Sequence, residues 1–207
     1  DLEFDNFKEI VEGVLKACQH YEIPLIGGDT NEASEIIISG TALGFCDTPI
    51  MKDGYKKGDL IAITRSIGLA ALGFELDTFD NVYVKHALKP EERIKEGVIL
   101  KDYATSATDI TDGLASELYE IKRDGFGFMI YEGMLKVSDE YKQLASELNL
   151  DYLDLILHVG EDFELLFTIS KDNISFICLT SCSLICIASS SLIPSKAGEE
   201  TPGDISG

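Results

Sequence analysis

Acidic residues beside glycines are the groups in this sequence most suited to chemistry. Glycine next to an acid lets the backbone approach a ligand closely. Carboxylate oxygens suit Mg²⁺, which usually takes one or two carboxylates together with substrate phosphates. In Asp109-x-x-Asp112 both carboxylates can face one side of a turn. Four such loops occur: Gly27-Gly28-Asp29-Thr30, Lys56-Lys57-Gly58-Asp59, Asp109-Ile110-Thr111-Asp112-Gly113 and Gly160-Glu161-Asp162.

Each of these loops also has a purely structural interpretation. Thr111 or Asp112 could cap the helix that follows, and Gly27–Asp29 could form a tight turn with a solvated acid. Other catalytic classes find little support, because the sequence has neither a Gly-x-x-x-x-Gly-Lys-Ser/Thr loop nor a Gly-x-Ser-x-Gly elbow. The histidines stand far apart, and we expect no catalytic histidine; they are His20, His86 and His158.

Composition and charge narrow the class of protein. The 207 residues are 45% hydrophobic with a formal net charge of −20. This charge argues against general binding to nucleic acid, whose phosphates would be repelled. No apolar run approaches the roughly 18 residues of a membrane span. The acidic start, residues 1–5, lacks the pattern of a signal peptide, so we expect a cytoplasmic location without membrane contact.

Hydrophobic periodicity predicts a mixture of helices and strands, which indicates an α/β or α+β sandwich. Helices are expected at 6–21, 68–76, 90–102, 112–123, 138–148 and 151–159. Strands are expected at 23–26, 35–46, 60–64, 126–131 and 163–169. The acidic loops then fall at strand ends and helix starts, where a helix offers free N–H groups and a positive dipole end to an anion.

Taken together and in order, four segments resemble the thiamine-monophosphate kinases. Ala104–Leu118 resembles the family's metal-binding segment, and Leu25–Thr30 resembles its first metal loop. Gly160–Thr168 resembles its substrate loop, and Lys85-His86, Pro90 and Arg93 match a further stretch. The resemblance covers about residues 5–172. It places the chain in the superfamily of aminoimidazole ribonucleotide synthetase.

The resemblance implies a two-layer α/β (α+β) architecture in two domains. Residues 1–50 would be the remainder of an N-terminal ATP- and metal-binding domain, and residues 51–174 a C-terminal α/β sandwich domain. Residues 175–207 depart from the family and would form a divergent, poorly ordered tail. Family members carry further acidic metal ligands upstream of the position of Asp1, so the chain is expected to hold part of the metal site.

The resemblance also implies a reaction. ATP would phosphorylate thiamine monophosphate to thiamine diphosphate by direct in-line transfer, with several Mg²⁺ ions, no side-chain acid or base, and a homodimer as the assembly. The implied metal ligands are Asp29, Asp109 and Asp112. The implied ATP contacts are Gly28, Asp29, Lys52 and Thr111, and Glu161 would contact the cationic thiamine substrate.

Three positions differ from the family pattern. Thr111 stands where serine is usual and keeps the hydroxyl, whereas Lys52 replaces an arginine and keeps the charge without the forked geometry. Val11 stands near a family tyrosine that contacts the nucleotide, so that contact is expected to be absent. Two alternatives stay open: another ATP-using enzyme of the superfamily, of the purine-pathway or hydrogenase-maturation type, and a non-catalytic nucleotide-binding remnant.

Overall fold

The computed structural model describes residues 2–173 together with the backbone of 185–191. The chain divides into two compact units, residues 1–45 and residues 46–207. The sequence-based domain boundary, between residues 50 and 51, lies a few residues further along. No helix among the described residues is long and apolar enough to cross a membrane.

The first unit contains helix α1, Phe4–His20, followed by a chain without regular structure. The helix confirms the amphipathic prediction but begins two residues earlier than expected, with Glu3 at its N-cap. The strands expected at 23–26 and 35–46 are absent from this described part. Strands need a hydrogen-bonded partner for their backbone groups, and nothing in this unit pairs with these segments.

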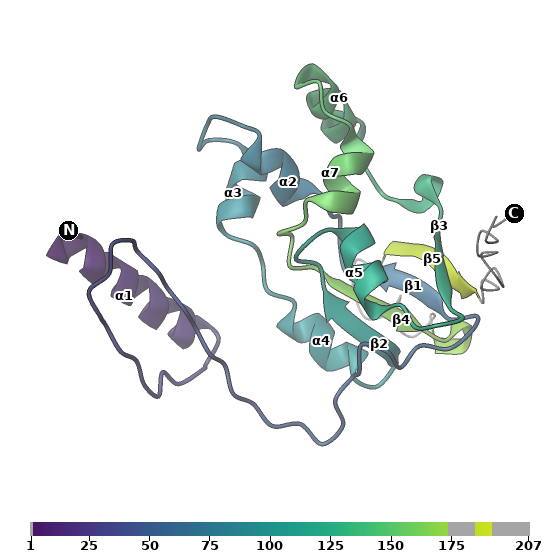
Figure 1. Ribbon diagram of the computed structural model, residues 1–207, viewed down its shortest axis with the longest axis horizontal. Coiled ribbons are helices and arrows are strands. Elements are labelled where there is room, and N and C mark those ends of the chain that lie inside the picture. Colours follow the sequence, from purple (N-terminus) through teal and green to yellow (C-terminus); the bar gives the residue numbers. More distant parts are fainter. Residues whose placement is uncertain (1, 174–184, 192–207) are drawn as a thin grey trace, which may run out of the picture. The chain divides into compact units, whose positions relative to one another are not determined.

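The second unit is built on one antiparallel sheet (Figure 1). The strand order is β2-β4-β1-β5-β3. Successive side chains of a strand point to opposite faces. Ile61 and Ile63 of β1 therefore join one hydrophobic core, and Ala62 joins the other. The strands are β1 Leu60–Ile63, β2 Ala104–Asp109, β3 Gly127–Ile130, β4 Leu165–Ile169 and β5 Ile185–Ser191.

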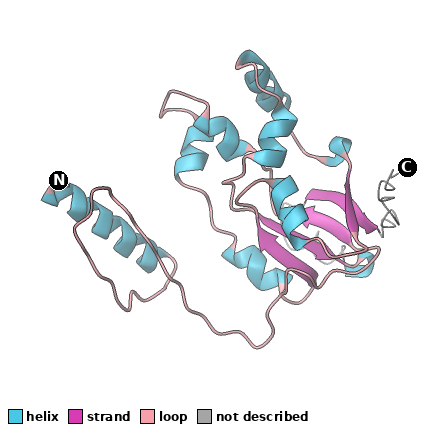
Figure 2. Ribbon diagram, viewed as in Figure 1, coloured by secondary structure: helices cyan, strands magenta, loops and turns pink. Residues whose placement is uncertain are grey.

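Helices cover the two faces of this sheet unequally (Figure 2). Helices α2, α5, α6 and α7 share the larger core with β1, whereas Leu100 of α4 joins the smaller core on the opposite face. The expected mixed architecture is therefore confirmed. The helices are α2 Leu69–Phe74, α3 Val82–Leu88, α4 Ile94–Leu100, α5 Leu114–Ile121, α6 Asp139–Glu147 and α7 Tyr152–His158, with 3-10 turns at Glu132–Met134 and Lys171–Asn173.

Several elements of the second unit differ from the sequence-based expectations, among them strand β2, which was not predicted. Helix α3 was not predicted, and the helix expected at 90–102 begins only at Ile94. Within the tail expected to be poorly ordered, 175–207, residues 185–191 form β5. This strand pairs with both β1 and β3 and so supplies hydrogen-bond partners to each. The rest of the tail lies outside the described residues.

Candidate functional site

Two of the predicted acidic loops lie side by side in the second unit. Residues 109–113 begin at the last residue of β2, and residues 160–164 precede β4, its neighbour in the sheet. The Glu161 amide donates to the Thr111 carbonyl oxygen at 2.9 Å. Ile110 exchanges two further backbone bonds with the second loop, donating to Glu164 at 2.8 Å and accepting from Phe163 at 3.1 Å. The structure thus brings the predicted metal loop and the predicted substrate loop together.

Glycines make this close approach of the two loops possible. Gly113 and Gly160 have φ of 92° and 85°, a region that side chains with a Cβ rarely adopt. A Cβ on Gly113 would lie 2.6 Å from the Leu157 carbonyl oxygen. A Cβ on Gly160 would overlap the backbone of Thr111 and Gly113. Glycine at 160 therefore lets the two loops meet, and glycine at 113 lets the start of α5 pass close to the end of α7.

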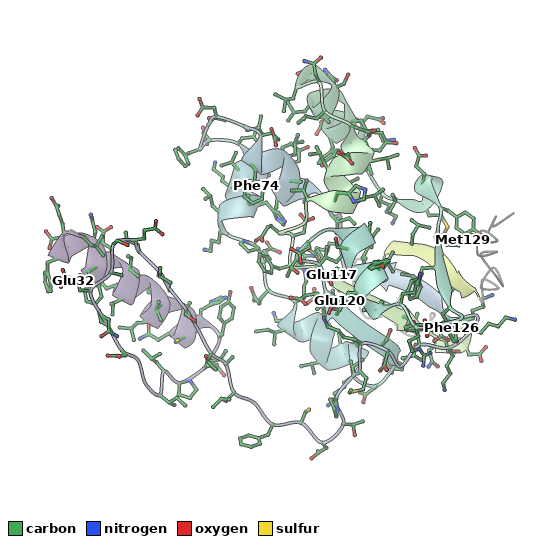
Figure 3. The ribbon with its side chains drawn as sticks, in the orientation of Figure 1. Glu32, Phe74, Glu117, Glu120, Phe126 and Met129 are labelled. Carbon is green, nitrogen blue, oxygen red and sulfur yellow. The ribbon has the colours of Figure 1, made fainter. Side chains whose placement is uncertain are left out.

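The start of helix α5 is not capped in the way the sequence suggested. Gly113 is the N-cap residue, and no side chain caps the helix from that position. Instead Glu117 reaches back from the first turn, and its Oε1 accepts from the Thr111 amide at 3.2 Å, the Thr111 hydroxyl at 3.0 Å and the Asp112 amide at 3.3 Å. Figure 3 labels Glu117 on α5. Only 3% of this residue is exposed.

Sequence reasoning did not single out Glu117, although a signal for it exists. The buried residues of α5 are Leu114, Glu117, Leu118 and Ile121, which is the spacing of one helix face. An acid on an otherwise apolar stripe must find hydrogen-bond partners, because an unpaired buried charge is costly. That requirement points to the loop before the helix.

The predicted ligand carboxylates of this unit are open to solvent. Asp109, Asp112 and Glu161 are all exposed. No group of three or more His, Cys, Asp or Glu side chains in the described ranges has a metal-binding arrangement. Asp29 and Gly28 belong to the first unit, where the Asp29 carboxylate accepts from the Thr30 amide at 2.9 Å and from Asn31 at 3.0 Å. Asp109 and Asp112 therefore share one loop of the second unit, whereas Asp29 belongs to the first unit.

Lys52 brings a cation to the same side of the second unit. Its Nζ lies 2.8 Å from the Glu120 carboxylate of α5, with 52% of the side chain exposed. The hydrogen bond to Glu120 raises the pKa of Lys52, and the charges of Glu117 and Asp109 raise it further. Lys52 thus stays charged within the field of the predicted metal loop.

A buried ion pair holds the end of the substrate loop. Arg93 donates to both carboxylate oxygens of Glu164, from Nε at 2.7 Å and from Nη2 at 2.6 Å. The Thr64 hydroxyl also donates to Glu164. The hydrogen bond with Glu164 raises the pKa of Arg93. Arg93 stands in a stretch that resembles the family, but its pairing with Glu164 was not predicted from the sequence.

Asp162, in the middle of the same loop, has a structural role. Its carboxylate accepts from the Gly68 amide at 2.5 Å and from the Ala70 amide at 3.0 Å, at the start of α2. His86 Nε2 lies 3.5 Å from it. Asp162 is 1% exposed. Of the acids at 161, 162 and 164, Glu161 is therefore the one free to meet a ligand.

Comparison with known proteins agrees with the family resemblance predicted from the sequence. Residues 1–46 match the family model "AIR synthase related protein, N-terminal domain", which covers the first unit. The thiamine-monophosphate kinase of Pyrococcus horikoshii is 37% identical over 177 residues, 83% of this chain and 56% of that protein. The chain is related to the thiamine-monophosphate kinases. The Buchnera aphidicola enzyme (subsp. Schizaphis graminum), 38% identical over 179 residues, covers 81% of this chain.

The relatives named thiamine-monophosphate kinase are longer than this chain. It spans 56% of the Pyrococcus horikoshii protein and 54% of the Buchnera aphidicola protein. The resemblance to these kinases, which the four ordered segments predicted, is confirmed over 83% of this chain by the first relative and over 81% by the second.

Solved structures share the fold. The thiamine monophosphate kinase from Aquifex aeolicus has a TM-score of 0.77 at 22% identity, covering 92% of this chain and 66% of that one. The protein described as "AaThiL complexed with AMPPCP and TMP" has the same TM-score at 24% identity, covering 92% and 63%. The Escherichia coli hydrogenase maturation protein HypE has a TM-score of 0.67 at 13% identity, covering 91% and 63%. At these identities the likeness concerns the fold alone.

Proposed function

We propose that the protein containing this chain transfers the terminal phosphate of ATP to thiamine monophosphate and so forms thiamine diphosphate. The observation that supports the proposal is the backbone pairing of loops 109–113 and 160–164, which carry the exposed acids Asp109, Asp112 and Glu161. The curated relatives with that activity in their names are 37% and 38% identical to this chain. The solved relative bound to AMPPCP and TMP adds support through its shared fold.

The donor set fits magnesium. Asp109 and Asp112 offer oxygen atoms only, from one exposed loop, and Mg²⁺ is usually held by one or two carboxylates with phosphate oxygens completing the site. When bound there, the ion supplies positive charge between two phosphate groups that would otherwise repel. A cluster of three acidic side chains is not needed for this mode of binding. Separately, we propose Asp29 of the first unit as a residue that can bind Mg²⁺.

The chain's own groups would orient and neutralise the reactants. Lys52 carries a positive charge beside α5 and would attract the phosphates of ATP. Thr111 and the backbone at Gly28 would contact the nucleotide. Glu161, exposed at the edge of the paired loops, would attract the positively charged ring of the thiamine substrate. Because phosphoryl transfer depends mainly on positioning and charge, no side-chain acid or base is required.

Assembly and location follow the same resemblance. We propose a homodimer that works in the cytoplasm. Sedimentation of the full-length protein tests the dimer directly, since one species of twice the chain mass is expected.

A substrate panel tests the proposed activity against its alternatives. The full-length protein would be incubated with Mg²⁺, ATP and either thiamine monophosphate, thiamine, or a purine-pathway ribonucleotide. Thiamine diphosphate from the first mixture alone is the expected result. ATP consumption with the ribonucleotide would favour the synthetase alternative. Tight binding of an ATP analogue without any product would favour a non-catalytic nucleotide-binding protein.

A further inference from the structure

Glu117 is a buried acid whose side-chain hydrogen bonds, within the described part of the chain, all go to the predicted metal loop. One oxygen, Oε1, accepts from the amides of Thr111 and Asp112 and from the Thr111 hydroxyl. Hydrogen bonds to an ionised acceptor are roughly twice as strong as neutral ones. The Glu117 carboxylate therefore fixes the backbone of two consecutive loop residues, Thr111 and Asp112, while the Asp112 side chain stays exposed.

The Thr111 hydroxyl is oriented by this arrangement. A threonine hydroxyl has one proton to donate and two lone pairs that accept. Its proton goes to Glu117, at an oxygen-to-oxygen distance of 3.0 Å. The lone pairs remain, so the hydroxyl can meet a cation or a hydrogen-bond donor of a ligand. It cannot donate to a phosphate oxygen while this bond lasts.

A carboxylate enforces this orientation in a way that an amide does not. An ionised carboxylate only accepts, so the hydroxyl proton must point toward it. A glutamine could turn its NH₂ group toward Thr111 and release the hydroxyl proton. An aspartate keeps the charge but is one methylene shorter, and its oxygen would fall short of the amides of Thr111 and Asp112.

We propose that Glu117 is a positioning residue for the phosphoryl transfer. It fixes the backbone of Thr111 and Asp112 and turns the Thr111 oxygen outward as an acceptor for a cation such as Mg²⁺. This inference rests on the proposed function and deepens it, since it assigns Thr111 to the cation rather than to donation toward ATP phosphates. Glu117 itself, at 3% exposure, does not reach a ligand.

Kinetics of three variants of the full-length protein test this role. Glu117→Asp keeps the charge and loses reach, Glu117→Gln keeps reach and loses charge, and Ser116→Ala alters an exposed neighbour on the same helix. We expect Glu117→Asp to lower kcat by about 10–100-fold and to raise the Mg²⁺ concentration at half-maximal rate, as for other residues that orient metal ligands. The KM for thiamine monophosphate should change little. Glu117→Gln keeps an acceptor for the two amides but can release the Thr111 hydroxyl, so it should also raise the Mg²⁺ concentration at half-maximal rate. Ser116→Ala should match the parent.

Normal kcat and Mg²⁺ dependence in Glu117→Asp would overturn the role of Glu117 in fixing the loop backbone. A normal Mg²⁺ dependence in Glu117→Gln would overturn its role in orienting the Thr111 hydroxyl. If both variants lower the melting temperature while kcat and the Mg²⁺ dependence stay normal, its role is structural only.

Hydrogen exchange provides a measurement that does not depend on activity. The amides of Thr111 and Asp112 should exchange at least about tenfold faster in Glu117→Asp, because each loses its acceptor, while amides of β4 keep their rates. Unchanged exchange at both amides would overturn the proposal whatever the kinetics show. A parent protein that makes no thiamine diphosphate, with exchange changed as expected, would refute the proposed function and leave the loop-holding role of Glu117 supported.

Discussion

Replacing Arg93 with methionine should destabilise the second unit strongly. Arg93 and Glu164 are buried, with side-chain exposures of 4% and 1%, and two hydrogen bonds of 2.6 and 2.7 Å join them. Methionine keeps much of the arginine stem's volume, so the main loss is the charge partner of Glu164. Removing one member of a buried pair typically costs about 3–5 kcal/mol. We expect Arg93→Met to lower the free energy of unfolding by that amount.

Arg65→Met is the matched control for this change. Arg65 also pairs with a glutamate, Glu91, at 2.5 Å, but the exposures are 45% and 63%. Exposed pairs of this kind contribute about 0–1 kcal/mol. Urea unfolding followed by circular dichroism measures both variants. A nearly equal effect of the two substitutions would refute the argument, since burial would then not decide the cost.

A double variant separates charge from packing at this pair. Arg93→Met combined with Glu164→Leu removes both charges, and replacing a buried pair by apolar groups is often neutral or stabilising. We expect the double variant to recover most of the stability lost in Arg93→Met. Failure to recover would mean that Arg93 contributes mainly through packing or through its other contacts, such as that with Glu91.

Two further predictions concern stability. Gly160→Ala should lower the free energy of unfolding by more than about 1 kcal/mol, because of its positive φ and the backbone it would overlap; Gly125→Ala, with φ of 79° and open space around it, should cost less, and equal melting temperatures would contradict this. Burial raises the pKa of the Tyr141 hydroxyl, which donates to Gly68 at 2.7 Å. An unfolded tyrosine ionises at about pH 10. The stabilisation that comes from keeping the buried Tyr141 hydroxyl protonated is therefore complete below that pH, and it is lost as the pH rises toward the folded-state pKa. Ultraviolet titration of tyrosinate should show one late-titrating group that disappears in Tyr141→Phe, and titration unchanged by that substitution would contradict the assignment.

Much of the fold was predictable because its signals are local. Helices α1, α2, α5, α6 and α7 have apolar stripes that can be recognised within a short stretch of sequence. Strand β4 is mostly apolar, with Thr168 as its one polar residue. The isoleucine-rich segment 35–46 shows the limit of such reasoning. Its composition favours a strand, but a strand also needs a partner, and the described part of the first unit has none for it. Strand β5 is the opposite case, a strand that was not predicted. Its pairing with β1 and β3 defines it as a strand.

The candidate site was predictable in its exposed groups and less so in its supports. Asp109, Asp112 and Glu161 stand beside glycines in recognisable loops, and the structure joins those loops. The roles of Arg93 and Glu164 depend on residues 71 positions apart, which no local pattern connects. Glu117 lies between these cases, because its place on an apolar face could have drawn attention to it.

The most direct test compares the full-length protein with its Asp109→Asn variant. The rate of thiamine diphosphate formation from Mg²⁺, ATP and thiamine monophosphate would be measured beside the melting temperature of each protein. We expect the parent to form thiamine diphosphate and the variant to lose about 10–100-fold of this rate, with little change in melting temperature because Asp109 is exposed. A parent that forms none, or a variant that is equally active, would contradict the account.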